Sequence, residues 1–202
     1  CSGGDVSGMG ADGMLKPRDE RVAELFQKQE TLTLRIHELG KVTVAALPGA
    51  AAGAGLSIAL ACDLRVASSN AFITTAFRNI GLSGDYGASW FLPRLIGLSK
   101  AKELFYTARR VGAEEGERLG LFNQVFPEET FRADAFNYAR EIANGPSVTL
   151  SRMKTNLNQG VNQDLKASLL LEAQQLIDSV GSAEAKEAID AFMKKRTPKF
   201  HP

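Results

Sequence analysis

The chain has 202 residues, of which 44% are hydrophobic and 23% charged, and this is the composition of one soluble globular domain. A formal net charge of +1 gives no support for binding to nucleic acid or to a membrane surface. Two cysteines do not build a disulfide framework or a zinc site, and no apolar run approaches the roughly 18 residues that span a membrane. We therefore expect a cytoplasmic protein with no metal and no tightly bound cofactor.

The predicted elements of the first half alternate between strands and helices. Residues 7–20 are rich in Gly, Asp and Pro and predict an exposed loop, and residues 21–39 carry apolar side chains at helical spacing. Further strands are predicted at 41–47, 63–67, 72–76 and 122–126, and further helices at 50–62, 99–108 and 112–119. We expect Ser99 to cap its helix and residues 81–87 to form a loop.

The second half is predicted to be helical throughout. Helical patterns cover 131–143, 148–157, 164–180 and 183–195, and the third carries an apolar stripe from Leu165 to Val180. The order of elements predicts an α/β core over residues 1–145 and a helical region over residues 146–202.

The supply of reactive side chains narrows the possible reactions. A Ser-His-Asp triad needs a histidine beside the nucleophile, and this chain has only His37 and His201. His201 is next to the last residue, and His37 is predicted on a helix with an ordinary surface pattern, so the sequence argues against a triad. Gly53 and Gly55 after a strand faintly suggest a dinucleotide loop. However, no acidic residue closes the next strand, as nicotinamide binding would require.

Several segments, taken in order, carry a family resemblance. They are residues 1–6, 48–63, 80–97, 120–127 and 191–200. Together they resemble the crotonase superfamily of enoyl-CoA hydratases and isomerases, over essentially the whole chain. The resemblance implies an α/β spiral of ββα units with C-terminal trimerisation helices, in a homotrimer or a dimer of trimers. It also implies a coenzyme A thioester as substrate.

The same resemblance subdivides the chain. Residues 1–145 are the expected crotonase-like core, and the family's strands before the Gly-rich turn are expected to be missing from it. Residues 146–202 are the expected oligomerisation and CoA-covering region.

Two backbone N–H groups are the expected catalytic core. Enolate formation from a thioester places negative charge on the carbonyl oxygen, and preorganised N–H donors stabilise that charge. By the resemblance, the donors are Gly4, in the turn Ser2-Gly3-Gly4-Asp5, and Ala54, at the start of a helix. Structural turn and packing roles for these small residues are the alternative.

The proton-transfer groups depart from the hydratase pattern. Family hydratases use two glutamates, where this chain has Ser57 and Phe77. Asp85 instead resembles the loop aspartate of phenylacetate-type isomerases and, less closely, the nucleophile of 4-chlorobenzoyl-CoA dehalogenase. We expect Asp85 to be the general acid and base of an isomerase. A hydratase, and a non-catalytic CoA- or RNA-binding or scaffold paralogue, remain alternatives.

Other residues are expected to bind substrate. Asp5 and Val6 resemble a loop that passes the adenine of CoA, and Phe192 and Lys195 resemble CoA contacts of a neighbouring subunit. Trp90, with Phe91, is expected either to line an acyl pocket or to pack in the core. Phe77 is expected beside Asp85. Ser57 is expected either to orient a water molecule or the Asp85 side chain, or only to fill the space of the missing glutamate.

Overall fold

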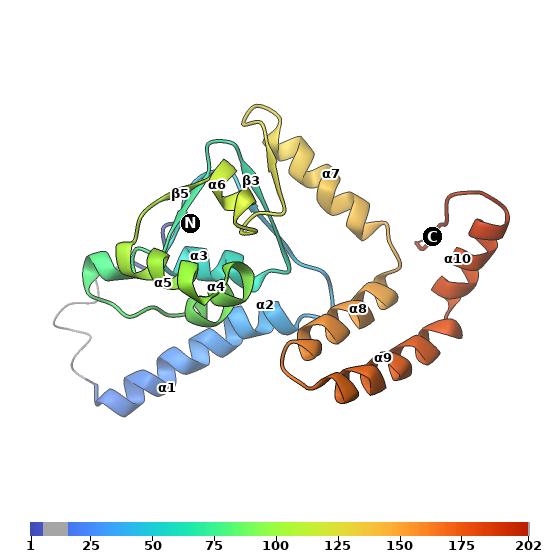
Figure 1. Cartoon of the computed structure of the whole chain (residues 1–202), viewed down its shortest axis with the longest axis horizontal. Coiled ribbons are helices and arrows are strands. Elements are labelled where there is room, and N and C mark those ends of the chain that lie inside the picture. The colour runs from blue at the N-terminus through green and yellow to red at the C-terminus, as the bar shows by residue number, and fades with distance from the viewer. Residues whose placement is uncertain (6–15, 202) are drawn as a thin grey trace. The chain divides into compact units, whose positions relative to one another are not determined.

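The computed structural model describes residues 1–5 and 16–201, and Figure 1 shows the chain. These residues form two compact units, one of residues 1–39 with 43–135 and one of residues 40–42 with 136–202. Val6 and residues 7–15 of the predicted loop lie outside the described residues.

The first unit contains two three-stranded sheets. One has the order β1 (Val44–Leu47), β3 (Leu64–Ser68), β6 (Gln124–Phe126), and both of its pairings are parallel. The other has the order β2 (Ala51–Ala52), β4 (Phe72–Thr74), β5 (Val111–Gly112), with a parallel and an antiparallel pairing. Parallel neighbours require crossover connections, which the intervening helices provide.

The helix predicted at 50–62 is shorter than expected. Its first residues form β2, where Ala51 and Ala52 pair with β4, and α3 (Ala54–Ala61) follows. Gly53 separates the two with φ 52° and ψ −127°, a backbone conformation outside the helical region. Small apolar residues are compatible with both strand and helix, so the sequence pattern did not show this boundary.

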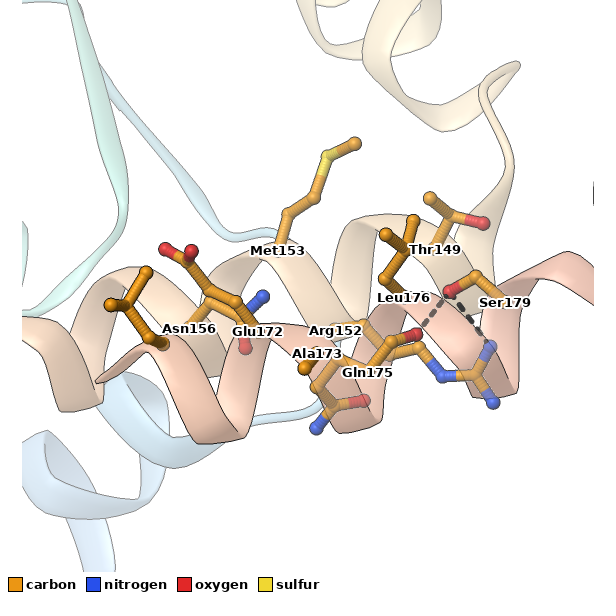
Figure 2. A pocket seen from close by; sticks show the side chains of 10 residues that line it. Thr149, Arg152, Met153, Asn156, Glu172, Ala173, Gln175, Leu176 and Ser179 are labelled. Atoms are coloured by element: carbon orange, nitrogen blue, oxygen red, sulfur yellow. Dashed lines mark hydrogen bonds between the residues drawn. The ribbon is translucent and has the colours of Figure 1, made fainter. Parts of the chain in front are cut away.

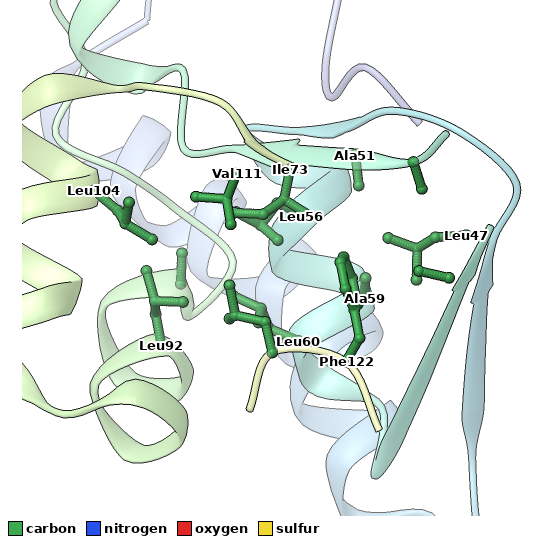
Figure 3. Packing of buried hydrophobic residues seen from close by; sticks show 14 of the residues in the cluster. Leu47, Ala51, Leu56, Ala59, Leu60, Ile73, Leu92, Leu104, Val111 and Phe122 are labelled. Carbon is green, nitrogen blue, oxygen red and sulfur yellow. The ribbon is translucent and has the colours of Figure 1, made fainter. Parts of the chain in front are cut away.

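Helix α3 is the centre of the hydrophobic core of the first unit. Leu56, Ala59 and Leu60 project from it among Ile73 and Val111, which come from the second sheet (Figure 3). Leu56 and Leu60 are only 1% and 3% exposed, and burying a leucine contributes about 1.5–3 kcal/mol. This packing fixes the position of the α3 N-terminus, where the expected donor Ala54 lies.

The predicted helix at 21–39 is confirmed, but it starts earlier. α1 (Arg18–Gln29) continues through a π-helical segment η3 (Glu30–Leu34) into α2 (Arg35–Glu38). Arg18 to Glu20 were predicted as loop. Pro17 precedes the helix and Asp19 and Glu20 lie in its first turn, both of which favour a helix start.

Helix α4 (Ala88–Ile96) and the short helix that precedes it, η4 (Phe77–Ile80), were not predicted. α4 follows η4 and the loop at 81–87, and it packs on α3 and on α5 (Leu98–Thr107). It contains Pro93 and is flanked by Gly87 and Gly97, which resemble loop signals.

The N-cap position of α5 is Gly97, so Ser99 lies inside the helix and the predicted Ser99 cap is wrong. α6 (Ala113–Arg118) completes the unit's helices before β6.

The second unit consists of helices. α7 (Phe131–Ala143) begins in the first unit and continues into the second, and α8 (Ser147–Gly160), α9 (Leu165–Val180) and α10 (Ala183–Met193) follow. The Asp164 carboxylate accepts the Ala167 N–H at 2.9 Å and caps α9. Glu184 of α10 accepts the N–H groups of Val148 and Thr149, both at 2.9 Å, at the start of α8.

The same helices leave large apolar side chains exposed. Leu165, Leu176 and Ile177 of α9 are 75%, 63% and 71% exposed, and Phe192 of α10 is 81% exposed. Within residues 1–5 and 16–201, no helix has both the length and the apolar character that membrane crossing needs.

Candidate active site

The N-terminal turn lies against the start of α3. The Cys1 nitrogen donates to the Ala50 carbonyl at 2.9 Å, and the Ala52 N–H donates to the Cys1 carbonyl at 3.0 Å. A Cβ atom placed on Gly3 would lie 3.3 Å from the Ala54 nitrogen. The turn that contains Gly4 therefore lies beside the first N–H group of α3, and the oxyanion role of Gly4 and Ala54 stays a prediction.

The close approach depends on a second glycine. A Cβ atom at Gly55 would lie 2.3 Å from the Cys1 carbonyl oxygen and 2.8 Å from the Cys1 sulfur. Since the nearest of these atoms is backbone, a side chain at Gly55 would push the N-terminal segment away from α3. Gly55 is thus required for the Gly4 turn to contact the helix.

The first N–H groups of α3 have no acceptor within the helix. The first intrahelical bond runs from the Ser57 N–H to the Gly53 carbonyl at 3.1 Å. The N–H groups of Ala54, Gly55 and Leu56 precede it, so the helix itself offers them no acceptor. The partial positive charge of a helix N-terminus adds to their attraction for an oxyanion.

Asp85 lies in the loop between η4 and α4 with its carboxyl group partly buried. Among the described residues its Oδ1 atom is buried without a hydrogen-bond partner. Burial in this site raises the pKa of the Asp85 carboxyl above its ordinary value. A carboxyl group with an unsatisfied oxygen and a raised pKa is suited to exchange a proton with a bound substrate.

Two contacts connect the Asp85 loop to neighbouring helices. The Ser57 hydroxyl is fully buried and lies 3.0 Å from the Asp85 carbonyl oxygen and 3.3 Å from the Gly53 carbonyl oxygen. The Tyr86 N–H donates to the Gln29 side-chain oxygen at 2.9 Å. Ser57 therefore contacts the backbone of the residue that the sequence marked as acid and base.

Phe77 forms an apolar wall between the two turns. Its ring is buried and stacks on Phe105 at a centroid distance of 6.1 Å. Cβ atoms placed on Gly53 and on Gly84 would each lie 3.7 Å from the ring. Phe77 thus lies between the start of α3 and Gly84, the residue before Asp85.

Trp90 belongs to an aromatic cluster on α4. Its ring contacts those of His37 at 5.3 Å and Phe91 at 4.9 Å, and the Arg94 guanidinium lies 3.7 Å from its centroid. His37 lies on a helix as predicted, and its half-buried ring packs against α4. A place for Trp90 in an acyl pocket stays a prediction.

The described contacts do not test the remaining candidates. Asp5 is exposed, and Val6 lies outside the described residues. In the second unit, the Arg196 guanidinium pairs with Glu187 and lowers the pKa of the Glu187 carboxyl to about 2. Phe192 and Lys195 belong to the same unit. Their contact with CoA stays a prediction.

Sequence reasoning missed Gln29. It lies at the helical spacing of Val22, Leu25 and Phe26, so it was counted within an apolar stripe. A polar residue in such a stripe was the available signal, because a polar side chain on a packing face requires a hydrogen-bond partner.

The second unit contains a separate hollow of about 440 Å³ between α8 and α9 (Figure 2). Arg152 and Ser179 meet at its wall through a hydrogen bond of 3.0 Å. None of the candidate site residues lines it. In the part of the chain that the structure describes, no three His, Cys, Asp or Glu side chains gather as metal ligands.

Comparison with known proteins gives the class of protein. The family model for enoyl-CoA hydratase/isomerase matches residues 1–202, and this chain belongs to that family. A crystal structure of an enoyl-CoA hydratase from Polaromonas sp. JS666 superposes with a TM-score of 0.93 at 32% identity, covering 100% of this chain and 77% of that one. The expected α/β crotonase fold is thereby confirmed.

Relatives within the family carry different activities in their names. A probable enoyl-CoA hydratase of Rhodobacter capsulatus is 35% identical over 99% of this chain and 76% of its own length. The 1,2-epoxyphenylacetyl-CoA isomerase of Escherichia coli is 31% identical over the same shares. The 4-chlorobenzoyl coenzyme A dehalogenase-1 of an Arthrobacter species is 34% identical over 79% of this chain and 59% of its own length.

Proposed function

We propose that this family member is an enoyl-CoA double-bond isomerase in which Asp85 is the general acid and base. The observation that carries the proposal is the buried Asp85 Oδ1 atom, which has no partner among the described residues and belongs to a carboxyl of raised pKa. Its loop is bonded to α3, and the N-terminus of that helix, whose first N–H groups have no acceptor within the helix, lies beside the Gly3 turn.

The reaction needs one carboxylate and one oxyanion site. With a 3-enoyl thioester, Asp85 takes a proton from the α carbon, and the C–H electrons move onto the thioester oxygen as a dienolate. The N–H groups of Gly4 and Ala54 stabilise that oxygen, and loss of one such donor costs about 10²–10³ in rate. Asp85 then returns the proton to the γ carbon, which regenerates the carboxylate and leaves a 2-enoyl thioester.

The raised pKa of Asp85 supports this role. A base with a higher pKa binds the proton of a weakly acidic carbon more strongly, so the first transfer becomes less unfavourable. Phe77 adds to the effect, because its buried ring excludes water beside the loop. The isomerase named among the relatives favours the phenylacetate-type branch for this chain.

Hydration is the second candidate, favoured by the hydratase name of the Rhodobacter capsulatus relative. Ser57 and Phe77, which take the places of the two usual glutamates, supply no carboxylate, and Ser57 is fully buried against a backbone carbonyl. A hydratase mechanism would therefore have to use Asp85 to activate water. A dehalogenase mechanism would use Asp85 as a nucleophile that forms an ester.

The substrate is proposed to be an acyl-CoA thioester, with no tightly bound cofactor. Asp5, Val6, Phe192 and Lys195 are the proposed contacts to CoA. Trp90 is the proposed contact to the acyl chain. The cytoplasmic location stays an expectation from the sequence.

Three substrates separate the candidate reactions. The protein is incubated with a 3-enoyl-CoA in deuterated water, with a 2-enoyl-CoA in heavy-oxygen water, and with 4-chlorobenzoyl-CoA. We expect a shifted double bond with deuterium at carbon, and neither oxygen uptake nor chloride release at a comparable rate. Oxygen uptake as the faster reaction would instead establish a hydratase. Binding of acyl-CoA without turnover would support a non-catalytic paralogue.

A further inference from the structure

The peptide group between Asp85 and Tyr86 is held through both of its polar atoms. Its carbonyl oxygen lies 3.0 Å from the Ser57 hydroxyl, and its N–H donates to Gln29 at 2.9 Å. Ser57 lies in α3, and Gln29 is the last residue of α1. Two helices that are separate in sequence thus fix one peptide plane.

That plane restrains the backbone of Asp85, from which the carboxyl group projects. The carboxyl Oδ1 atom has no hydrogen-bond partner among the described residues, so no hydrogen bond from them orients it through that oxygen. Tyr86 has φ +50°, a left-handed conformation that is costly for a non-glycine residue. The contacts to Ser57 and Gln29 offset this cost and keep the loop in one conformation.

Gln29 is itself held in place. Its side chain is half-buried, and its backbone carbonyl accepts the hydroxyl of Thr33 at 3.2 Å. Thr33 is 3% exposed and belongs to the π-helical segment that starts directly after Gln29. π-Helical turns frequently occur at functional sites. Here the turn stands where α1 presents the Gln29 amide to the Asp85 loop.

We propose that Gln29 is a positioning residue of the active site, which acts with Ser57 to orient the Asp85–Tyr86 peptide and thereby the catalytic carboxyl. The inference rests on the proposed function for the role of Asp85. The contact itself is independent of that function.

The test compares Gln29→Leu and Gln29→Glu with a matched control, Gln27→Leu. Leucine removes the acceptor at nearly constant size, whereas glutamate keeps an acceptor oxygen at the same reach. Gln27 is an exposed residue of the same helix. Enoyl-CoA isomerisation is measured as kcat and KM across pH, and residue-resolved amide hydrogen exchange is measured at Tyr86.

Gln29→Leu is expected to lower kcat about 10- to 100-fold, the typical cost of a small misplacement of a reacting group, while KM changes less than about 3-fold. A loosened loop exposes Asp85 to water, which lowers the pKa of its carboxyl group. The acid limb of the pH profile of this variant should therefore move to lower pH. Exchange at the Tyr86 amide should be faster. Gln29→Glu should retain most of kcat, with its acid limb at higher pH because of the added negative charge.

The outcomes separate this inference from the proposed function. If Gln29→Leu matches Gln27→Leu in kcat, acid limb and Tyr86 exchange while Asp85→Asn is inactive, the positioning role is wrong and the proposed function stands. If Asp85→Asn retains wild-type isomerisation, the acid–base assignment fails, and the positioning role of Gln29 fails with it, whatever the amide exchange shows.

Discussion

The buried carboxyl of Asp85 has a thermodynamic consequence at the scale of the residue. Burial raises its pKa in the folded chain, so the folded state holds this proton to higher pH than the unfolded state does. The corresponding stability is fully present below the unfolded pKa of about 3.9 and is lost as the pH rises through the folded pKa. At neutral pH the ionised group therefore opposes folding.

Replacing Asp85 by asparagine should remove this opposition. We expect Asp85→Asn to raise the melting temperature at pH 7, and the gain should shrink as the pH falls to about 4. Thermal unfolding of wild type and variant across this range measures the effect. Asp178→Asn, at an exposed position of α9, is the control. Destabilisation by Asp85→Asn at pH 7 would contradict a desolvated carboxyl.

At this scale the sequence gives candidates only where a motif marks them, and their roles stay predictions. Small residues beside free N–H groups marked Gly4 and Ala54, and the structure brings their segments together. Gln29 was not predicted, because its partner is a backbone N–H that lies 57 residues away in the chain. A contact of this kind depends on tertiary packing, and no local pattern contains it.

At the scale of the elements, long periodic segments were predicted well. The predicted helices of the second half and the strands flanking α3 are all present. The short β2 and the helix α4 were missed for opposite reasons. Ala51 and Ala52 carry no strand signal of their own, and their pairing with β4 is a tertiary contact. Gly87, Pro93 and Gly97 made the helix α4 resemble a loop.

The contact between the N-terminal turn and α3 gives a test at this scale. In Gly55→Ala the new methyl group would lie 2.3 Å from the Cys1 carbonyl, so the turn must move away from the helix. We expect kcat to fall by about 10²–10³ through loss of the Gly4 donor, with a destabilisation of about 1–3 kcal/mol. Steady-state kinetics and denaturant unfolding measure the two effects.

Gly49→Ala is the matched control for that change. No atom lies within 4 Å of a Cβ placed at Gly49, so the same methyl group is accommodated there. Equal activity in the two variants would show that the turn does not supply an oxyanion donor.

At the scale of the whole molecule, the exposed apolar side chains of α9 require a partner surface. Leu176 and Ile177 are 63% and 71% exposed in the single chain. Exposed apolar surface of this kind marks interaction sites in soluble proteins. The resemblance predicts that the partners are further copies of this chain, in a trimer or a dimer of trimers.

Leu176→Glu should weaken that assembly, because it places a charge in an apolar contact. We expect light scattering after size-exclusion chromatography to give a trimer or hexamer for wild type and smaller species for the variant. Gln174→Glu, an exposed change on the same helix, should leave the mass unchanged. A wild-type monomer at micromolar concentration would contradict the predicted assembly.

The most direct test of the central claim is a paired assay of wild type and Asp85→Asn with 3-enoyl-CoA in deuterated water. The account predicts that wild type moves the double bond with deuterium uptake and that the variant loses this activity by about 10²–10⁴. Acyl-CoA binding should persist in the variant, since the N–H groups of Gly4 and Ala54 are unchanged. An Asp85→Asn variant as active as wild type would contradict the account and place the acid–base group on another residue.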